Sequence, residues 1–307
     1  MLGRLIGVLQ TVLPVVAVLG IGMLSRKKLT REGVNALKGV AVDIALPAVL
    51  LNAFASADYS LRSIALPLIM FAVCLAGWAL GGVARRALRI PSRFVPFLTT
   101  GFEAGMLGYT LYAMLYGANQ AANFALVDLG QVLFVFTVYK ALLSADGSRG
   151  AIARDMIASP IILAILFGVL LGATGLYRAL IPSGVSGIFD ACVKFVAAPT
   201  SALILLSIGY DLVLKDVRWG ETMKVVAVRL AIMLPLMGAT IALAAALFGY
   251  EPALTGAIAV MFILPPPFVL PVFADDKDQR AYVSSALSVS TLVAIAGFAA
   301  LAAIGTP

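Results

Sequence analysis

The feature that most constrains this sequence is a succession of long apolar runs, each close to the length needed to cross a lipid bilayer. An α-helix rises about 1.5 Å per residue, so about 20 apolar residues span the hydrocarbon core. We expect ten transmembrane helices, at residues 5–24, 39–56, 64–84, 95–116, 121–143, 156–174, 187–210, 224–248, 253–274 and 281–304. The chain is therefore predicted to be an all-α, multi-pass membrane protein.

The composition agrees with this class and excludes several kinds of enzyme. Of the 307 residues 62% are hydrophobic and only 12% are charged, whereas a soluble domain has about 25% charged residues. The chain has no histidine, which excludes histidine-containing metal sites, HExxH proteases and Ser-His catalysis. An intramembrane aspartyl protease would need YD and GxGD motifs; GYDL at 209–212 matches the first, and no GxGD occurs. We expect no enzymatic activity and no cofactor.

Basic residues are distributed unevenly among the connections between the apolar runs. Most of the 22 Lys and Arg residues lie in alternate connections, at 26–38, 85–93, 140–154, 215–224 and 277–280. Because positively charged loops remain in the cytoplasm, we expect both termini on the outer side of the cell (inner) membrane. The net charge of +7 follows from the same bias. Since this charge is spread over separate loops, we expect the lipid bilayer and not a nucleic acid as partner.

Ten spans divide into two groups of five, which favours an inverted repeat because five crossings leave the two halves in opposite orientations. We expect the first repeat at residues 1–150 and the second at 151–307. When the sequences of the two halves are aligned, residues 105–126 pair with residues 264–287. The identities are few, so the prediction rests on helix number, opposite orientation and the positions of helix-breaking residues.

Two of the expected spans contain residues that interrupt a helix. Span 4 has Gly101, Gly105 and Gly108, and span 9 has Pro265, Pro266 and Pro267. Unpaired backbone is costly in hydrocarbon, so a break at membrane depth survives only where it is buried in protein or lines a water-filled cavity. Breaks in corresponding spans are typical of secondary transporters, in which the N-termini of half-helices bind anionic groups.

We expect the substrate site at these two breaks. A small carboxylate would be received by backbone N–H groups, with hydroxyl groups from Tyr109 and Thr110. Lys194 lies about 10 Å inside the outer end of span 7, where it either contacts the anion or pairs with Asp190 at i−4. The expected substrate-binding residues are Gly105, Gly108, Tyr109, Thr110, Pro265, Pro266, Pro267, Phe268 and Lys194.

Four polar side chains within the spans are candidates for ion coupling, since charged groups inside a membrane are costly and usually functional. Glu103 lies about 12 Å inside span 4, and Asp128 about 10 Å inside span 5; Gln131 is one turn from Asp128. A desolvated carboxyl at this depth would carry a proton or bind Na⁺. Asp43, one turn inside span 2, either joins this group or faces the interface. Arg229, one turn inside span 8, is expected to snorkel to the surface, with an anion contact as the alternative.

Several stretches resemble the auxin efflux carrier family, in particular its short bacterial members identified as malate or malonate permeases. LKGVAVDIALPAVLLNAF (37–54) is similar to the family's second helix, GFEAGMLGY (101–109) to its first crossover, and LPPPFVLPVFADD with SSALSVSTLVAI to its last two helices. The family pattern N-x-G-x-x-G-x-P has Glu103 and Thr110 here in place of Asn and Pro.

The resemblance implies a fold similar to that of sodium/proton antiporters and bile-acid symporters. In that fold helices 1, 2, 6 and 7 form a scaffold, which we expect to join two subunits in a homodimer. Helices 3–5 and 8–10 form a moving core, in which broken helices 4 and 9 cross at the site.

We therefore expect a secondary transporter of small organic anions, namely carboxylates such as malate, malonate or auxin-like acids. Because no ATP-binding motif is present, the energy would come from an ion gradient or from the substrate's own gradient, and we expect coupling to H⁺ or Na⁺. Elevator-type movement of the core against the scaffold would expose the site alternately. The alternative is a cation/proton exchanger of the same fold, in which the deep carboxylates bind the transported ion.

Overall fold

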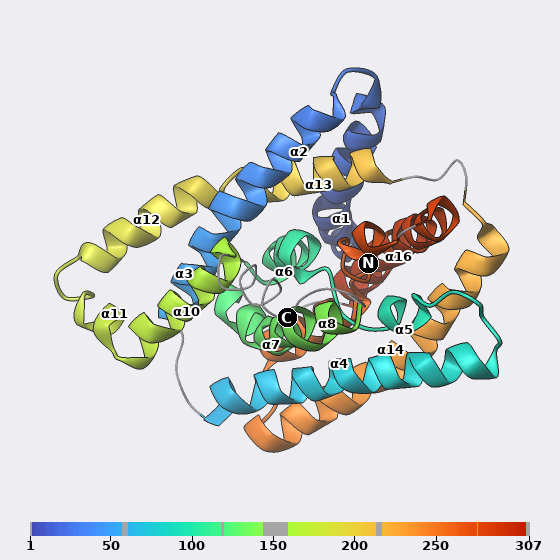
Figure 1. Ribbon diagram of the computed structural model, residues 1–307. Helices are drawn as coiled ribbons and strands as arrows, with labels where there is room; N and C mark the ends of the chain where they lie inside the picture. The colour runs from blue at the N-terminus through green and yellow to red at the C-terminus, as the bar shows by residue number, and fades with distance from the viewer. Residues whose placement is uncertain are drawn as a thin grey trace.

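The computed structural model describes residues 2–56, 61–117, 120–143, 159–212, 217–274 and 276–304, and within these ranges every regular element is helical (Figure 1). The α-helices are α1 (Leu2–Leu24), α2 (Arg31–Gly39), α3 (Leu46–Ala55), α4 (Leu61–Ala87), α5 (Val95–Leu98), α6 (Tyr109–Tyr116), α7 (Ala121–Phe134), α8 (Lys140–Leu143), α10 (Pro160–Ala173), α11 (Leu176–Ala179), α12 (Val185–Ala197), α13 (Thr200–Asp211), α14 (Trp219–Phe248), α15 (Pro252–Ile263) and α16 (Lys277–Ile304). Short 3-10 or π-helical turns are η1 (Ser25–Lys27), η2 (Val40–Ala45), η3 (Ala104–Gly108), η5 (Val135–Tyr139) and η6 (Leu270–Phe273).

Seven helical segments within the described ranges are long and apolar enough to cross a membrane: Ile6–Ser25, Arg31–Ala55, Ile64–Ala87, Ala121–Leu143, Val185–Asp211, Trp219–Phe248 and Lys277–Ile304. This confirms an all-α, multi-pass membrane protein. The number of long spans differs from the expected ten. Two of the other three are the shorter apolar helices α10 and α15, and the third, expected at 95–116, is interrupted. The expected boundary between the repeats at residue 150 lies outside the described residues.

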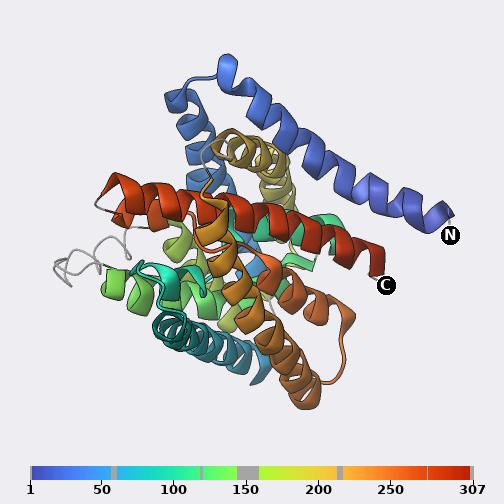
Figure 2. The ribbon, with the colours of Figure 1, turned by 90° about the vertical axis from the view of Figure 1, so that its right-hand side faces the viewer.

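The helices pack in two groups. In the first group, α1 packs against α13, and α3 packs against α10 and α12. In the second group, α4 packs against α7 and α14, and α15 packs against α7, α14 and α16. Figure 1 shows the two groups side by side, with α10–α12 at the left edge and the antiparallel pair α4 and α14 at the bottom. Figure 2 shows α1 running beside α16, with both chain ends at the same end of the bundle.

Glycines allow α1 and α13 to approach closely. A Cβ atom on Gly22 would lie 2.2 Å from the Leu206 carbonyl oxygen, and one on Gly209 would lie 2.1 Å from the Leu19 carbonyl oxygen. Because lipid offers no hydrophobic drive between helices, close van der Waals packing at small residues is the usual way in which membrane helices associate. At this pair, small residues therefore bring the backbones of the two helices into close contact.

Candidate functional site

Both expected interruptions occur within the second group of helices. After α5 ends at Leu98, no α-helix forms until α6 begins at Tyr109, with the π-helical turn η3 in between. Gly101 has φ +67, a left-handed conformation that glycine adopts without steric cost. After α15 ends at Ile263, the proline segment leads only into the 3-10 turn η6. The second break is therefore not followed by the half-helix that the sequence suggested.

The two breaks contact each other although more than 150 residues separate them in the sequence. The backbone N–H of Glu103 donates to the Pro265 carbonyl oxygen at 2.9 Å. A Cβ atom on Gly101 would lie only 3.0 Å from Cγ of Pro267. A Cβ atom on Gly108 would lie 2.7 Å from Cδ1 of Leu264. Glycines on one side thus let side chains of the other side come close, and the two segments form one junction.

The side chain of Glu103 occupies N–H groups from both breaks. Its Oε2 accepts a hydrogen bond from the backbone N–H of Phe268 at 2.6 Å, and its Oε1 accepts one from the N–H of Met106 at 3.4 Å. Met106 lies in the first turn of η3, where backbone N–H groups lack helical partners. The carboxylate of Glu103 thus occupies the N–H groups at which we expected a substrate carboxylate to bind.

Arg229 of α14 binds the carbonyl side of the same junction. Its guanidinium donates to the carbonyl oxygens of Leu98 (3.0 Å), Gly101 (2.8 Å), Leu264 (2.9 Å) and Thr100 (3.4 Å). The side chain is 4% exposed, so the expectation that it snorkels to the surface is wrong. The reason is that the last carbonyl groups of α5 and α15 have no helical partner, and a planar guanidinium offers five donors to satisfy them.

The charges of Glu103 and Arg229 are complementary to the helix ends that they contact. The N-terminal end of a helix carries a partial positive charge and the C-terminal end a partial negative charge. Glu103 lies at the start of η3, and Arg229 lies at the ends of α5 and α15. The predicted anion site takes account only of the N–H groups of the breaks. Their carbonyl groups also need partners, so the interruptions themselves imply buried hydrogen-bond donors nearby.

Asp128, Gln131 and Tyr109 form a buried network that is joined to the first break. The Tyr109 hydroxyl donates to Oδ2 of Asp128 at 3.1 Å, and Nε2 of Gln131 donates to Oδ1 at 3.0 Å. The N–H of Phe102 donates in turn to Oε1 of Gln131 at 3.4 Å. The hydroxyl of Thr110 donates to the carbonyl oxygen of Met106, in the preceding turn η3, at 3.2 Å.

The remaining expected site residues lie partly at the breaks and partly away from them. Pro265, Pro266 and Pro267 are buried in the second break, and Gly105 lies in η3 with Leu46 nearby. Lys194 and Asp43 are exposed. Helix α12, which carries Lys194, packs against α3, η2 and α13 and lies at the left edge of Figure 1, away from the central α6. The structure does not bring these two charges to the junction, and Asp190 accepts its hydrogen bond from the Tyr177 hydroxyl at 2.7 Å.

A cavity of about 330 Å³ lies next to the junction. Its lining includes Met106 and Phe268, whose N–H groups bind Glu103, and three basic residues, Arg31, Lys38 and Arg280. Arg31 and Lys38 both pair with Asp211, Arg31 at 2.9 Å. With three cations and one carboxylate in this lining, the cavity has an excess of positive charge directly beside the N–H groups of the breaks.

Comparison with known proteins gives two similarities. A family described as membrane transport protein matches residues 147–300. An uncharacterized transporter of Methanothermobacter thermautotrophicus is 27% identical over 302 residues, which cover 94% of this chain and 95% of that protein. The family match includes Arg229 and the whole proline break.

Proposed function

Since the chain belongs to the membrane transport protein family, that of the auxin efflux carriers, we propose that it is a secondary transporter of small organic anions. The family membership supports a transporter; the substrate class rests on the junction. Carboxylates such as malate or malonate are the substrates that we propose, with a proton as the coupling ion.

The observation that carries this proposal is the position of the Glu103 carboxylate. It accepts hydrogen bonds from backbone N–H groups of both breaks, from Phe268 at 2.6 Å and from Met106 at 3.4 Å. Backbone N–H groups at a helix start bind anions through hydrogen bonds and through the helix dipole. The internal carboxylate therefore displays the chemistry that a substrate carboxylate would use.

Competition for these N–H groups supplies a coupling mechanism. Two ionised carboxylates in contact repel each other strongly in a buried site, so one of them must be neutralised. Protonation of Glu103 would weaken its hold on the Phe268 N–H and leave that donor for the substrate. One proton would then be taken up with each carboxylate that replaces Glu103, and release of the substrate would let Glu103 ionise and return.

The cavity beside the junction supports access for an anion. Its cations, Arg31, Lys38 and Arg280, would raise the local concentration of an anionic substrate, and its lining already includes Met106 and Phe268. A volume of about 330 Å³ lies at the lower end of the usual range for small-molecule sites, which is about 300–1,000 Å³. A small dicarboxylate fits this volume better than a large amphipathic acid.

We propose further that the two packing groups are the scaffold and the moving core of an elevator. The first group holds α1, α2, α3, α10, α12 and α13, and the second holds α4–α8 and α14–α16. The two halves of the chain, residues 1–150 and 151–307, would be related as inverted repeats, and each half would contribute helices to both groups. The broken segments would cross in the core, and the scaffold would join two subunits. Both termini would lie on the outer side of the cell membrane.

A cation/proton exchanger is the second candidate, because Glu103 and Asp128 are both buried carboxyl groups. In that case Glu103 would need its oxygens for a cation. Here Oε2 already accepts a hydrogen bond from the Phe268 N–H at 2.6 Å. A backbone donor at this place favours an anion site over a cation site.

The test is uptake of labelled malate and malonate into liposomes that contain the purified protein. For one proton per anion, we expect KM to fall by up to about tenfold for each unit by which pH is lowered. Glu103→Gln keeps an acceptor oxygen but cannot ionise, so its KM should not change with pH. Asp43→Asn makes the same chemical change at an exposed carboxyl and should retain the pH dependence of the wild type.

Three results would contradict the proposal. Unchanged pH dependence in Glu103→Gln would show that the coupling proton is elsewhere. A KM that follows Na⁺ and not pH would assign coupling to sodium. Proton movement on addition of cations without any organic solute, together with no uptake of carboxylates, would support the exchanger.

A further inference from the structure

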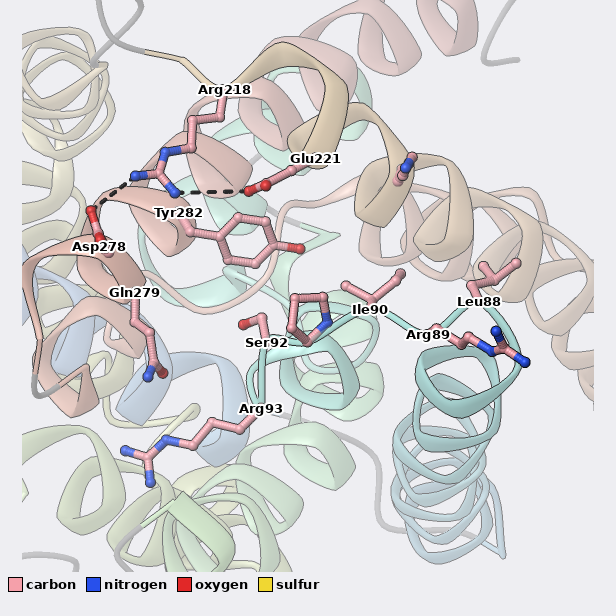
Figure 3. A pocket seen from close by; sticks show the side chains of 12 residues that line it. Leu88, Arg89, Ile90, Ser92, Arg93, Arg218, Glu221, Asp278, Gln279 and Tyr282 are labelled. Carbon is pink, nitrogen blue, oxygen red and sulfur yellow. Dashed lines mark hydrogen bonds and ion pairs between the residues drawn. The ribbon is translucent and has the colours of Figure 1, made fainter.

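A second pocket, distinct from the cavity at the junction, lies where three segments of the second helix group meet (Figure 3). The segments are the turn after α4 (residues 88–93), the start of α14 (residues 218–224) and the start of α16 (residues 278–282). Its volume is about 440 Å³. All three segments belong to basic connections, so this pocket is at the basic end of the bundle.

The pocket has an excess of positive charge that is not neutralised internally. Its lining includes four basic residues, Arg89, Arg93, Arg218 and Lys224, and two acidic residues, Glu221 and Asp278. Both acids pair with the same cation, Arg218, at 4.0 Å and 2.9 Å. The side chains of Arg89 and Lys224 have no ion pair or hydrogen bond with any residue in the described ranges. Two cations therefore remain available to an anionic ligand.

Arg89 has a backbone conformation that arginine rarely adopts. It follows the last turn of α4 with φ 51, and the N–H of the next residue, Ile90, donates to the Arg85 carbonyl oxygen at 3.0 Å. This is the helix-ending geometry in which glycine is the usual residue. Unfavourable conformations of this kind are concentrated at functional sites, so an arginine here suggests that its cationic side chain is needed at this position.

Tyr282 supplies an independent indication of a ligand. The residue is 5% exposed and lines the pocket. Its hydroxyl has no hydrogen-bond partner among the described residues. Figure 3 shows the ring pointing across the pocket, between Glu221 and Ser92 toward Ile90. Because a buried hydroxyl without a partner is unfavourable, a bound oxygen acceptor would satisfy it.

We propose that this pocket binds the phosphate-bearing headgroup of an anionic phospholipid. Phosphate combines negative charge for Arg89 and Lys224 with acceptor oxygens for the Tyr282 hydroxyl. Three apolar side chains near the pocket favour a lipid over a free phosphate compound: Leu88 is 58% exposed, Trp219 54% and Met223 46%. Cations beside exposed apolar residues and a tryptophan are typical of the level at which lipid headgroups meet acyl chains.

A headgroup bound here would connect elements that surround the junction. The turn at 88–93 leads into α5, α14 carries Arg229, and α16 follows the proline break. Holding these three segments together would stabilise the arrangement in which Arg229 reaches both breaks. We therefore expect the lipid to raise the thermal stability of the folded protein.

The experiment measures the Tm of the full-length protein in detergent with added phosphatidylglycerol or phosphatidylcholine. Phosphatidylglycerol should raise the Tm of the wild type more than phosphatidylcholine does. Arg89→Gly removes the cation and relieves the backbone, so its Tm without lipid should not fall, while most of the phosphatidylglycerol shift should be lost. Tyr282→Phe should lose part of the shift. Arg86→Gln removes an exposed charge from α4 outside the pocket and should keep the full shift.

The outcomes separate a lipid site from general charge attraction and from a site for a free phosphate compound. If Arg89→Gly and Lys224→Gln keep the same shift as Arg86→Gln, general attraction between basic loops and anionic lipid causes the effect, and the proposal fails. If glycerol 3-phosphate in solution raises the Tm and phosphatidylglycerol does not, the ligand is a free phosphate compound and the lipid is excluded. Loss of the shift in the pocket variants alone, with no response to glycerol 3-phosphate, is the result that we expect.

Discussion

The glycine break and the proline break interrupt their helices by different means. In the glycine break, Gly101 adopts φ +67, and the chain resumes as η3 and α6 with Glu103 at the start. In the proline break, residues without N–H groups end α15, and only the short turn η6 follows. Glycine changes the direction of the chain, whereas proline removes its donors.

This difference makes the proline break dependent on groups outside its own segment. Its carbonyl groups at Leu264 and Pro265 accept hydrogen bonds from Arg229 and from the N–H of Glu103, and its Phe268 N–H donates to the Glu103 carboxylate. The glycine break contributes the ionisable group and the proline break contributes backbone alone. Removing the contacts that join the two breaks, one at a time, tests this dependence.

Removing Arg229 should have the largest effect. Arg229→Met keeps an unbranched chain but leaves the carbonyl oxygens of Leu98, Gly101 and Leu264 without their donor. Each buried polar group left without a partner costs about 1–3 kcal/mol, so we expect the free energy of unfolding to fall by more than about 3 kcal/mol. Thermal unfolding in detergent measures this loss, and uptake should be abolished.

Arg229→Lys is the matched variant that keeps the positive charge and loses only the guanidinium geometry. A single ammonium group is not planar and reaches fewer carbonyl groups than a guanidinium, so its Tm should lie between those of the wild type and Arg229→Met. If the free energy of unfolding of Arg229→Met lies within about 1 kcal/mol of the wild-type value, water satisfies these carbonyl groups, and the two breaks do not depend on Arg229.

The Arg229 contacts also show what the sequence could and could not predict. Helix-breaking residues in two apolar runs predicted where the backbone would be interrupted, because proline and glycine act locally. The partners of the exposed backbone groups come from distant segments, and the spacing of Arg229 or Glu103 in the sequence does not reveal them. Of the three expected spans that are not long helices, those at 95–116 and 253–274 are interrupted by the breaks, and the third, at 156–174, is the shorter helix α10. Lys194 and Asp43 are predicted site residues because of their depth inside the spans. Depth does not reveal which side of a helix faces the junction.

Closing the space between the breaks should have an intermediate effect. Gly101→Ala forces a left-handed conformation on an alanine and places a Cβ atom 3.0 Å from Cγ of Pro267. Strain of this kind costs about 1–3 kcal/mol, and we expect the Tm to fall accordingly. Because the clash also pushes the proline segment away, the Phe268 N–H should move from Glu103, and the KM for carboxylates should change as well.

Gly238→Ala is the control for this substitution. Gly238 lies inside α14, and a Cβ atom added there would have nothing within 4 Å, so alanine should be neutral or should stabilise the helix by up to about 1 kcal/mol. If Gly101→Ala behaves in the same way as Gly238→Ala, the approach of the two breaks is not tight, and close contact does not fix their relative position.

The smallest effect is expected for Thr110, which differs from the proline of the family pattern. Its hydroxyl donates to the Met106 carbonyl oxygen in the preceding turn η3. Thr110→Val should therefore change the free energy of unfolding by at most about 1 kcal/mol and KM by less than about threefold. Tyr109→Phe, which removes a bond to Asp128, should destabilise more. A rise in KM of about tenfold or more in Thr110→Val, with unchanged stability, would show that this hydroxyl turns to the substrate. In that case the glycine break would bind the substrate through a side chain as well as through backbone, and its difference from the proline break would be greater than the present contacts indicate.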